Sequence, residues 1–213
     1  MSVLSKLEII ERIKKGDLSF EPSLDLFQIQ THSVDLRLGS TFLIPKSWEM
    51  TQAGRVSLNI DYLSGNKKRY FDVIDLEPGQ YFEILPREFI IVTALEKIKL
   101  ANDLVGTLYP RSSVNRRGLS VDLSGVIDAG YEGNLIVPVR NNTANQIIRV
   151  YPGERFCQIV FQSLSRKVRP KKSRYQKKDI IVGILKERSR KEMKLIREGK
   201  IKELKLSFSL GTK

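Results

Sequence analysis

Residues 125–133 have the sequence GVIDAGYEG, which is the starting point for predicting the fold. Three glycines, Asp128 and Tyr131 within nine residues predict a tight β-hairpin whose backbone is open to a ligand. A planar base can be recognised by backbone N–H and C=O groups in such a hairpin, and Asp128 could orient and deprotonate a water molecule. Taken alone, the stretch is better explained by a glycine-rich hairpin with a turn-favouring Asp.

The segments around this hairpin predict a mainly β fold. Turn residues separate many short, strand-like stretches, which is typical of an antiparallel sandwich, barrel or jelly roll. The predicted strands are 35–44, 56–62, 68–74, 80–86, 89–95, 104–109, 119–123, 134–140, 146–150 and 156–163.

The two ends of the chain have a different pattern. Ser5 and Glu8 form a capping-box pattern that predicts a helix ending at Gly16. In the tail, residues 185–206 have helical spacing, which Gly199 weakens or splits. We therefore expect helices at both ends of a β domain.

Composition excludes several chemistries. The chain has one cysteine, Cys157, and one histidine, His32, so it can assemble neither a disulfide framework nor the His/Cys/Cys zinc site of many nucleobase deaminases. His32 is best explained as an ordinary loop or strand residue. No basic stretch leads into an apolar segment at the N-terminus, and the expected location is cytoplasmic.

The formal charge of +13 lies entirely in the tail. Residues 1–165 contain 19 basic and 19 acidic side chains, whereas residues 166–213 contain 18 basic and 5 acidic ones. A neutral body with a basic tail is not typical of a protein built around duplex DNA, although the tail could bind triphosphates or nucleic acid.

Three further stretches carry polar residues where chemistry could occur. Arg111 follows an apolar strand and precedes two serines. This arrangement suits a phosphate-binding site, but it is also a common turn sequence. Asp35 lies in an apolar strand opening, where it either binds a backbone turn or faces a metal-bound water. Gln158 lies inside an apolar strand, as a structural amide or as a triphosphate contact.

Together with the hairpin, these stretches resemble, in the same order, the first four signature motifs of trimeric dUTPases. Seventeen positions separate Arg111 from Asp128, as in those enzymes. The N-terminal part is similar to the dCTP-deaminase branch of the same superfamily, in the sequences FEP at 20–22 and SVDLRLG at 33–39. The resemblance covers roughly residues 4–178.

The resemblance implies a distorted β-barrel or jelly roll of the dUTPase type, with an N-terminal helix and a basic, partly helical C-terminal extension. We expect a β domain at 1–165 and a basic segment at 166–213, containing a site-closing arm and a helical extension. Family members form homotrimers with sites at subunit boundaries, so a homotrimer is expected.

The two branches of the superfamily differ in a few residues, and one of these positions is informative here. The deaminases use a glutamate in the strand after the hairpin to move protons, and the resemblance places it at position 138. This chain has Pro138, which has no proton to transfer. Glu132 and Glu154 are the nearest carboxylates in sequence, and neither matches the family position. The sequence therefore favours a dUTP pyrophosphatase that forms dUMP and pyrophosphate.

The resemblance also implies residue roles. Asp128 is the catalytic base, and Asp35 supports Mg²⁺ through water. The hairpin backbone reads uracil, and Tyr131 lies under the deoxyribose. The expected substrate-binding residues are Arg111, Ser112, Ser113, Arg116, Gly125, Val126, Ile127, Tyr131, Gln158, Arg174, Tyr175 and Lys178.

Two alternatives stay open from the sequence. One is a dCTP deaminase, or a bifunctional dCTP deaminase and dUTPase, using a carboxylate other than one at 138. The other is a non-catalytic relative that senses nucleotides or binds nucleic acid through its tail. The C-terminal Gly-rich segment of dUTPases has no counterpart after residue 166, and Arg174–Lys178 resembles the site-closing segment of the deaminases only loosely.

Overall fold

The structure is a computed structural model that describes residues 2–59, 70–122, 125–169 and 189–209. Its contacts divide the chain into two compact units. The first comprises residues 1–46 and 71–183, and the second comprises residues 47–70 and 184–213. The expected division at residue 165 stays a prediction. In the described part of the chain, no helix is long and apolar enough to span a membrane.

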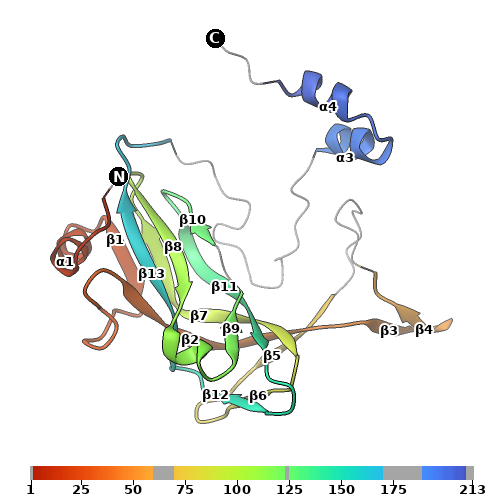
Figure 1. The fold of residues 1–213 in the computed structure, drawn as a ribbon, viewed down its shortest axis with the longest axis horizontal. Coiled ribbons are helices and arrows are strands. Elements are labelled where there is room, and N and C mark those ends of the chain that lie inside the picture. The colour runs from red at the N-terminus through yellow and green to blue at the C-terminus, as the bar shows by residue number, and fades with distance from the viewer. Residues whose placement is uncertain (1, 60–69, 123–124, 170–188, 210–213) are drawn as a thin grey trace. The chain divides into compact units, whose positions relative to one another are not determined.

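The first unit is a strongly curled, half-barrel antiparallel sheet (Figure 1). Its strands are β1 (Leu18–Glu21), β2 (Val34–Pro45), β5 (Phe71–Asp75), β7 (Phe89–Leu100), β8 (Leu104–Pro110), β9 (Leu119–Val121), β10 (Val126–Ile127), β11 (Glu132–Asn141) and β13 (Arg155–Ser163). The strand order is β10-β8-β13-β2-β7-β11-β9, with β1 on β7 and β5 on β2. A separate pair is formed by β6 (Phe82–Ile84) and β12 (Ile148–Val150).

This architecture confirms the predicted fold class. The N-terminal helix α1 (Lys6–Lys14) has the predicted capping box: the Ser5 hydroxyl accepts a hydrogen bond from the Glu8 N–H at 3.5 Å, and the Glu8 carboxylate accepts one from the Ser5 N–H at 2.7 Å. Gly16 follows the helix with a φ of +75°, a conformation that suits glycine. A short helix, α2 (Ser112–Asn115), directly follows Arg111.

The second unit contains a hairpin of β3 (Trp48–Thr51) and β4 (Gly54–Ser57) and two helices, α3 (Arg190–Arg197) and α4 (Ile201–Ser207). Gly199, at φ +67°, separates the two helices, as predicted. The strand expected at 56–62 is wrong within the described residues, because β4 ends at Ser57. The turn between the hairpin strands, with Gly54 at φ +93°, has no strong turn dipeptide and was not recognised.

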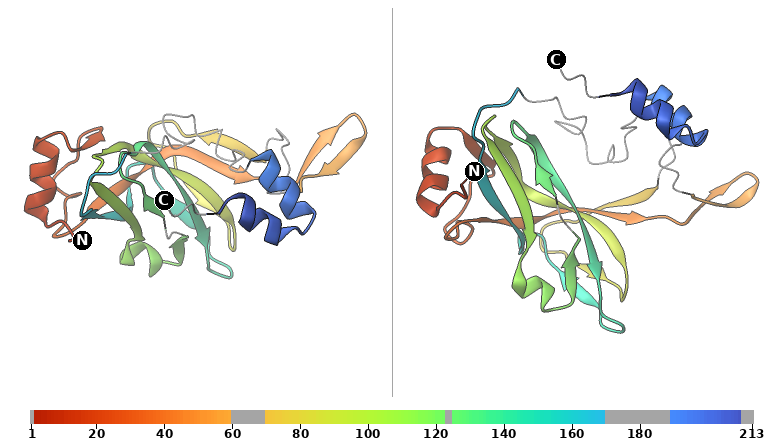
Figure 2. Two further views of the ribbon diagram at one scale, coloured as in Figure 1. Left: turned by 90° about the horizontal axis from the view of Figure 1, so that it is seen from above. Right: turned by 45° about the horizontal axis from the view of Figure 1, so that its top comes forward.

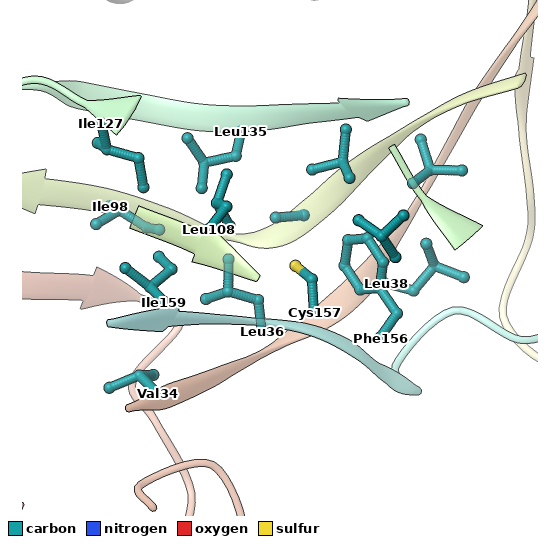
Figure 3. Packing of buried hydrophobic residues seen from close by; sticks show 14 of the residues in the cluster. Val34, Leu36, Leu38, Ile98, Leu108, Ile127, Leu135, Phe156, Cys157 and Ile159 are labelled. Atoms are coloured by element: carbon teal, nitrogen blue, oxygen red, sulfur yellow. The ribbon is translucent and has the colours of Figure 1, made fainter. Parts of the chain in front are cut away.

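Alternating side chains from the long strands build the core of the first unit (Figure 3). The curl of the sheet around this core can be followed in two further views (Figure 2). In β11, Gly133, Leu135, Val137 and Val139 are buried, whereas the residues between them face the other side of the strand. The same period places Leu36 and Leu38 of β2 in the core. Burying these side chains in close packing is the dominant stabilising contribution to the fold.

Antiparallel register brings polar residues together at one end of this sheet. Gln158 of β13 pairs with Asp35 of β2 on one side and with Tyr109 of β8 on the other. Arg155 lies at the start of β13, and Arg111 follows the end of β8. Three segments that are distant in sequence thus present their polar side chains next to one another.

Asn141 ties the end of β11 to two other segments. Its side chain is fully buried, and its amide nitrogen donates to the carbonyl oxygens of Ile84, at 2.9 Å, and Gln146, at 2.7 Å. Its amide oxygen accepts from the N–H and the hydroxyl of Thr143, at 2.9 and 2.7 Å. Every polar atom of this side chain is therefore paired inside the protein.

We predict that Asn141→Ala lowers the free energy of unfolding by about 3 kcal/mol, because it leaves several buried backbone groups without partners. Urea unfolding followed by circular dichroism measures this loss. Asn142→Ala is the matched control, because the Asn142 side chain is exposed and its N–H bond to the Gly118 carbonyl is kept. Equal stability of the two variants would contradict the assigned role of Asn141.

Candidate functional site

A buried carboxylate organises the polar end of the sheet. Asp35 is 2% exposed, and its Oδ2 lies 3.2 Å from Nε of Arg111 and 3.1 Å from Nη1 of Arg155. The Gln30 amide donates to the same oxygen at 3.4 Å. One carboxylate therefore holds two guanidinium groups that come from different strands.

The residues on either side reinforce this arrangement. Arg111 Nη1 donates to the carbonyl of Arg155 at 3.0 Å, and Arg155 Nη1 donates to the carbonyl of Phe27 at 2.5 Å. The Gln158 amide nitrogen donates to the Pro110 carbonyl at 3.3 Å, while its oxygen accepts from the Ser33 hydroxyl at 3.1 Å. The sequence singled out Asp35, Arg111 and Gln158, and the structure brings these three together.

The remaining predicted phosphate contacts lie at the rim of this cluster or outside the described residues. Ser112 and Ser113 open α2 and are exposed, as is Arg116 at its end. Hydroxyl and guanidinium groups there are available to solvent and hence to a ligand. Arg174, Tyr175 and Lys178 lie outside the described residues.

The glycine-rich hairpin forms the second group of predicted site residues. Val126 and Ile127 form β10, which pairs with Thr107 and Gly106 of β8, and the Gly125 carbonyl accepts from the Leu108 N–H at 3.0 Å. Asp128 is exposed at the end of β10. Because β8 carries Thr107 opposite Val126 and leads on to Arg111, about 13 Å of strand separates the hairpin from the arginine cluster.

Tyr131 of this hairpin is held in place by a hydrogen bond of its hydroxyl. Its hydroxyl donates to the Asn134 carbonyl at 2.8 Å, and a Cβ added at Gly133 would come within 2.9 Å of that hydroxyl oxygen. The glycine at 133 therefore leaves room for the ring. Burial raises the pKa of Tyr131 to about 12, so the phenol stays neutral and keeps its hydrogen.

Burial also sets the electrostatics behind the arginine cluster. It raises the pKa of Asp35, an effect that Arg111 and Arg155 oppose. Glu96 is 1% exposed and accepts from the Gln28 amide at 2.6 Å and the Arg37 N–H at 3.0 Å, and burial raises its pKa as well. The Cys157 thiol is buried beside these carboxylates, which raises its pKa strongly and makes it unreactive.

Position 138 lies on the outer face of β11. Val139 pairs with Val121 of β9, and both side chains are in the core, so the next pair, Pro138 and Asp122, faces the other way. The Asp122 N–H donates to the Pro138 carbonyl at 3.0 Å. The sequence analysis does not single out Asp122, because nothing in the sequence indicates which segment lies beside β11.

The described part of the chain offers no preformed cage for a metal ion. Among the residues that the structure describes, no three His, Cys, Asp or Glu side chains gather in a way that could hold one. The Asp35 carboxylate has two guanidinium partners, so its evident task is to hold these arginines. A site of this kind fits a Mg²⁺ ion carried by a triphosphate, for which the protein supplies few direct ligands. Support of Mg²⁺ by Asp35 through water stays a prediction.

A family model described as "dCTP deaminase-like" matches residues 3–164, which include both groups of site residues. The chain belongs to the dCTP deaminase-like family. The predicted superfamily is therefore confirmed, and the chain is an enzyme of nucleotide metabolism.

Individual relatives agree with this assignment. A protein of Sulfurihydrogenibium sp., named "dCTP deaminase, dUMP-forming", is 39% identical over 82% of this chain and 91% of its own length. A protein of Persephonella marina with the same name is 36% identical over 82% of this chain and 91% of its own. Among solved structures, the dCTP deaminase of Agrobacterium tumefaciens matches with a TM-score of 0.58 at 28% identity. That match covers 76% of this chain and 48% of the other protein, so the chain spans about half of that protein's length.

These relatives correct one expectation. A plain dUTP pyrophosphatase is the wrong interpretation, because relatives that are 31–39% identical are named dCTP deaminases, most of them dUMP-forming. The alternative of a bifunctional dCTP deaminase and dUTPase fits better. The resemblance places the deaminase glutamate at position 138, where this chain has Pro138, and a carboxylate elsewhere is required for the alternative. Strand pairing instead places Asp122 opposite Pro138.

We predict that Asp35→Asn lowers the free energy of unfolding by about 2–3 kcal/mol. Breaking a fully buried ion pair costs about 3–5 kcal/mol, and solvent reduces the loss here because the arginine side chains are 25% and 28% exposed. Asp25→Asn is the control, since Asp25 is 43% exposed and its pair with Arg37 should contribute about 0.5–1 kcal/mol. Chemical denaturation measures both, and a smaller loss for Asp35→Asn than for Asp25→Asn would refute the assignment.

A second prediction concerns Tyr131 at high pH. Its folded-state pKa of about 12 exceeds the ordinary value of 10, so its stabilising contribution is complete below pH 10 and disappears as the pH rises towards 12. Tyr131→Phe should therefore lose less unfolding free energy than the wild type over this range. Tyr109→Phe, at an exposed tyrosine, should behave like the wild type. Urea titrations at stepped pH values make the comparison; parallel curves for wild type and Tyr131→Phe would contradict it.

Proposed function

We propose that this enzyme converts dCTP to dUMP, by deamination of the cytosine base and hydrolysis between the α- and β-phosphates. The observation that carries the proposal is the 39% identity, over 82% of the chain, with a protein named "dCTP deaminase, dUMP-forming". The two groups of site residues support it, because one is suited to phosphates and the other to a base and sugar.

The arginine cluster is the proposed triphosphate site. Asp35 holds the Arg111 guanidinium in place before a ligand arrives, which reduces the ordering cost of binding. The guanidinium has five N–H donors, so its bonds to Asp35 and to the Arg155 carbonyl leave capacity for phosphate oxygens. Ser112, Ser113 and Arg116 add donors at the exposed rim, and Gln158 fixes the end of β8.

The hairpin is the proposed site for the nucleoside. The backbone groups of Gly125, Val126 and Ile127 read the edge of the base, and the neutral Tyr131 ring lies under the deoxyribose. Asp128, exposed at the end of β10, orients and deprotonates the water that attacks the α-phosphorus. A 2′-hydroxyl would clash with the Tyr131 ring, so dCTP is favoured over CTP.

We further propose Mg²⁺ as the cofactor and a homotrimer as the assembly. When bound through the triphosphate, the ion neutralises charge that develops on the phosphates during hydrolysis. The homotrimer would place the hairpin of one subunit against the arginine cluster of another. A span of about 13 Å along β8 between the two groups in one chain is compatible with a site completed by a neighbour.

A product assay with purified protein, Mg²⁺ and dCTP tests the proposed function. Ammonia, pyrophosphate and dUMP should appear in equal amounts, and CTP should give little product. Accumulation of dUTP without pyrophosphate would contradict the hydrolytic half of the proposal. Release of neither ammonia nor pyrophosphate from dCTP would contradict the proposal as a whole.

Asp128→Asn tests the hydrolytic half separately. The variant should form pyrophosphate at least about 100-fold more slowly, because a carboxamide cannot accept the proton of the attacking water. Ammonia release from dCTP should continue, so that dUTP accumulates. Asp75→Asn is the control, an exposed strand aspartate that binds the Thr41 hydroxyl. Wild-type pyrophosphate release by Asp128→Asn would remove this residue from the mechanism.

A further inference from the structure

Asp122 directly follows β9 and lies opposite Pro138 of β11. The register of β9 and β11 pairs Leu119, Ser120 and Val121 with Asn141, Arg140 and Val139. The hydrogen bond from the Asp122 N–H to the Pro138 carbonyl extends this register by one residue beyond the end of β9. Side chains of directly opposed residues in an antiparallel pair have Cβ atoms about 4.5–5.5 Å apart. The Asp122 side chain therefore starts next to Cβ of residue 138.

The proline fits this place in the sheet. In an antiparallel strand the N–H and C=O of a residue point to the same neighbour, and the Pro138 carbonyl accepts from the Asp122 N–H at 3.0 Å. The missing N–H of Pro138 therefore faces β9 at the point where that strand ends. Proline removes one ladder hydrogen bond there without disturbing the pairing of β11 with Ile91 of β7.

The surroundings of the pair combine an apolar surface with a charged edge. Pro138 lies beside Ile91 on β7, on the outer face of the sheet, and Ile136 shares that face of β11. Asp122 is 42% exposed, accepts from the Ser120 hydroxyl at 2.8 Å and lies 3.7 Å from Nε of Arg140. The Arg140 guanidinium in turn lies 5.4 Å from the centre of the Phe89 ring.

We propose that Asp122 performs the proton transfer that a carboxyl group at position 138 would otherwise perform in cytosine deamination. The inference rests on the proposed function, since it names the group that deaminates dCTP. The base would lie flat against Pro138 and Ile91, with its C4 edge directed at the Asp122 carboxylate. Ser120 and Arg140 hold that carboxylate at the edge of the apolar surface.

The proton transfers balance with one carboxylate. Water forms a bond to C4, and its proton passes through Asp122 to N3. The hydroxyl proton of the resulting tetrahedral centre then passes through Asp122 to the amino group. The C4–N4 bond breaks, its electron pair leaves with nitrogen as ammonia, and the C4 carbonyl of uracil forms. Asp122 ends in its starting state, and the only co-reactant is water.

The contrary interpretation is that Asp122 serves only as the surface partner of Arg140. The two are about half exposed, and ion pairs of that kind contribute little to stability. A purely structural Asp122 would leave turnover unchanged when it is replaced. The two interpretations therefore predict a different rate of turnover for an Asp122 variant, but the same stability.

The experiment measures two rates on each variant: ammonia release from dCTP, and pyrophosphate release from dUTP with Mg²⁺. Asp122→Asn should lower ammonia release at least about 100-fold and leave pyrophosphate release from dUTP within about twofold. The double variant Asp122→Asn with Pro138→Glu should recover ammonia release, because it returns a carboxylate to the same face. Asp122→Glu should keep part of the activity.

Asp72→Asn is the matched control. Asp72 is an exposed strand aspartate whose carboxylate lies 3.2 Å from the Lys46 ammonium, so its replacement also removes a surface ion pair. Both rates should stay at the wild-type level. Wild-type ammonia release by Asp122→Asn, or an equal loss of both rates, would overturn the role of Asp122 but not the proposed function. A wild-type chain that releases no ammonia would overturn the proposed function together with this role.

Discussion

The polar end of the sheet depends on one interaction, the burial of the Asp35 carboxylate between two arginines. Removing this charge from water is costly, and burial raises the pKa of Asp35 accordingly. The cost is offset only because Arg111 and Arg155 arrive from the end of β8 and the start of β13. The pairing of β8 with β13 and of β13 with β2 brings both arginines to Asp35, and the ionic contact in turn stabilises this register. A proposed phosphate site built in this way is already assembled before a ligand binds.

Local chemistry made much of the fold predictable. The capping box at Ser5, the division of the tail helices at Gly199 and the alternation in β11 depend on residues close in sequence, and all three are found in the structure. The hairpin at 48–57 and the short strand β1 were not predicted. Their sequences have no strong alternation or turn dipeptide, and β1 is fixed by long-range contacts, among them its pairing with Lys97–Leu100.

The individual residues of the candidate site were predictable from the sequence, whereas most of their interaction partners were not. Asp35, Arg111 and Gln158 were each identified as polar groups within or next to apolar strands. In the structure, each forms an ion pair or a hydrogen bond. The partners themselves, Arg155 for Asp35 and Ser33 for Gln158, come from strand register. Register is a long-range property, which a motif read along the chain does not contain.

The same limit explains the incorrect inference drawn from Pro138. A sequence motif identifies a catalytic group by its position in the chain, whereas a substrate contacts that group at a location in the folded protein. In an antiparallel sheet, two positions on neighbouring strands share that point when they are directly opposed, as Asp122 and Pro138 are. Loss of a carboxylate from one strand is therefore compatible with its presence on the next, and chemistry can be kept while the motif is lost. The proposed role of Asp122 follows from this geometry, because its carboxylate belongs to the segment opposite Pro138 and not to the motif that contains position 138.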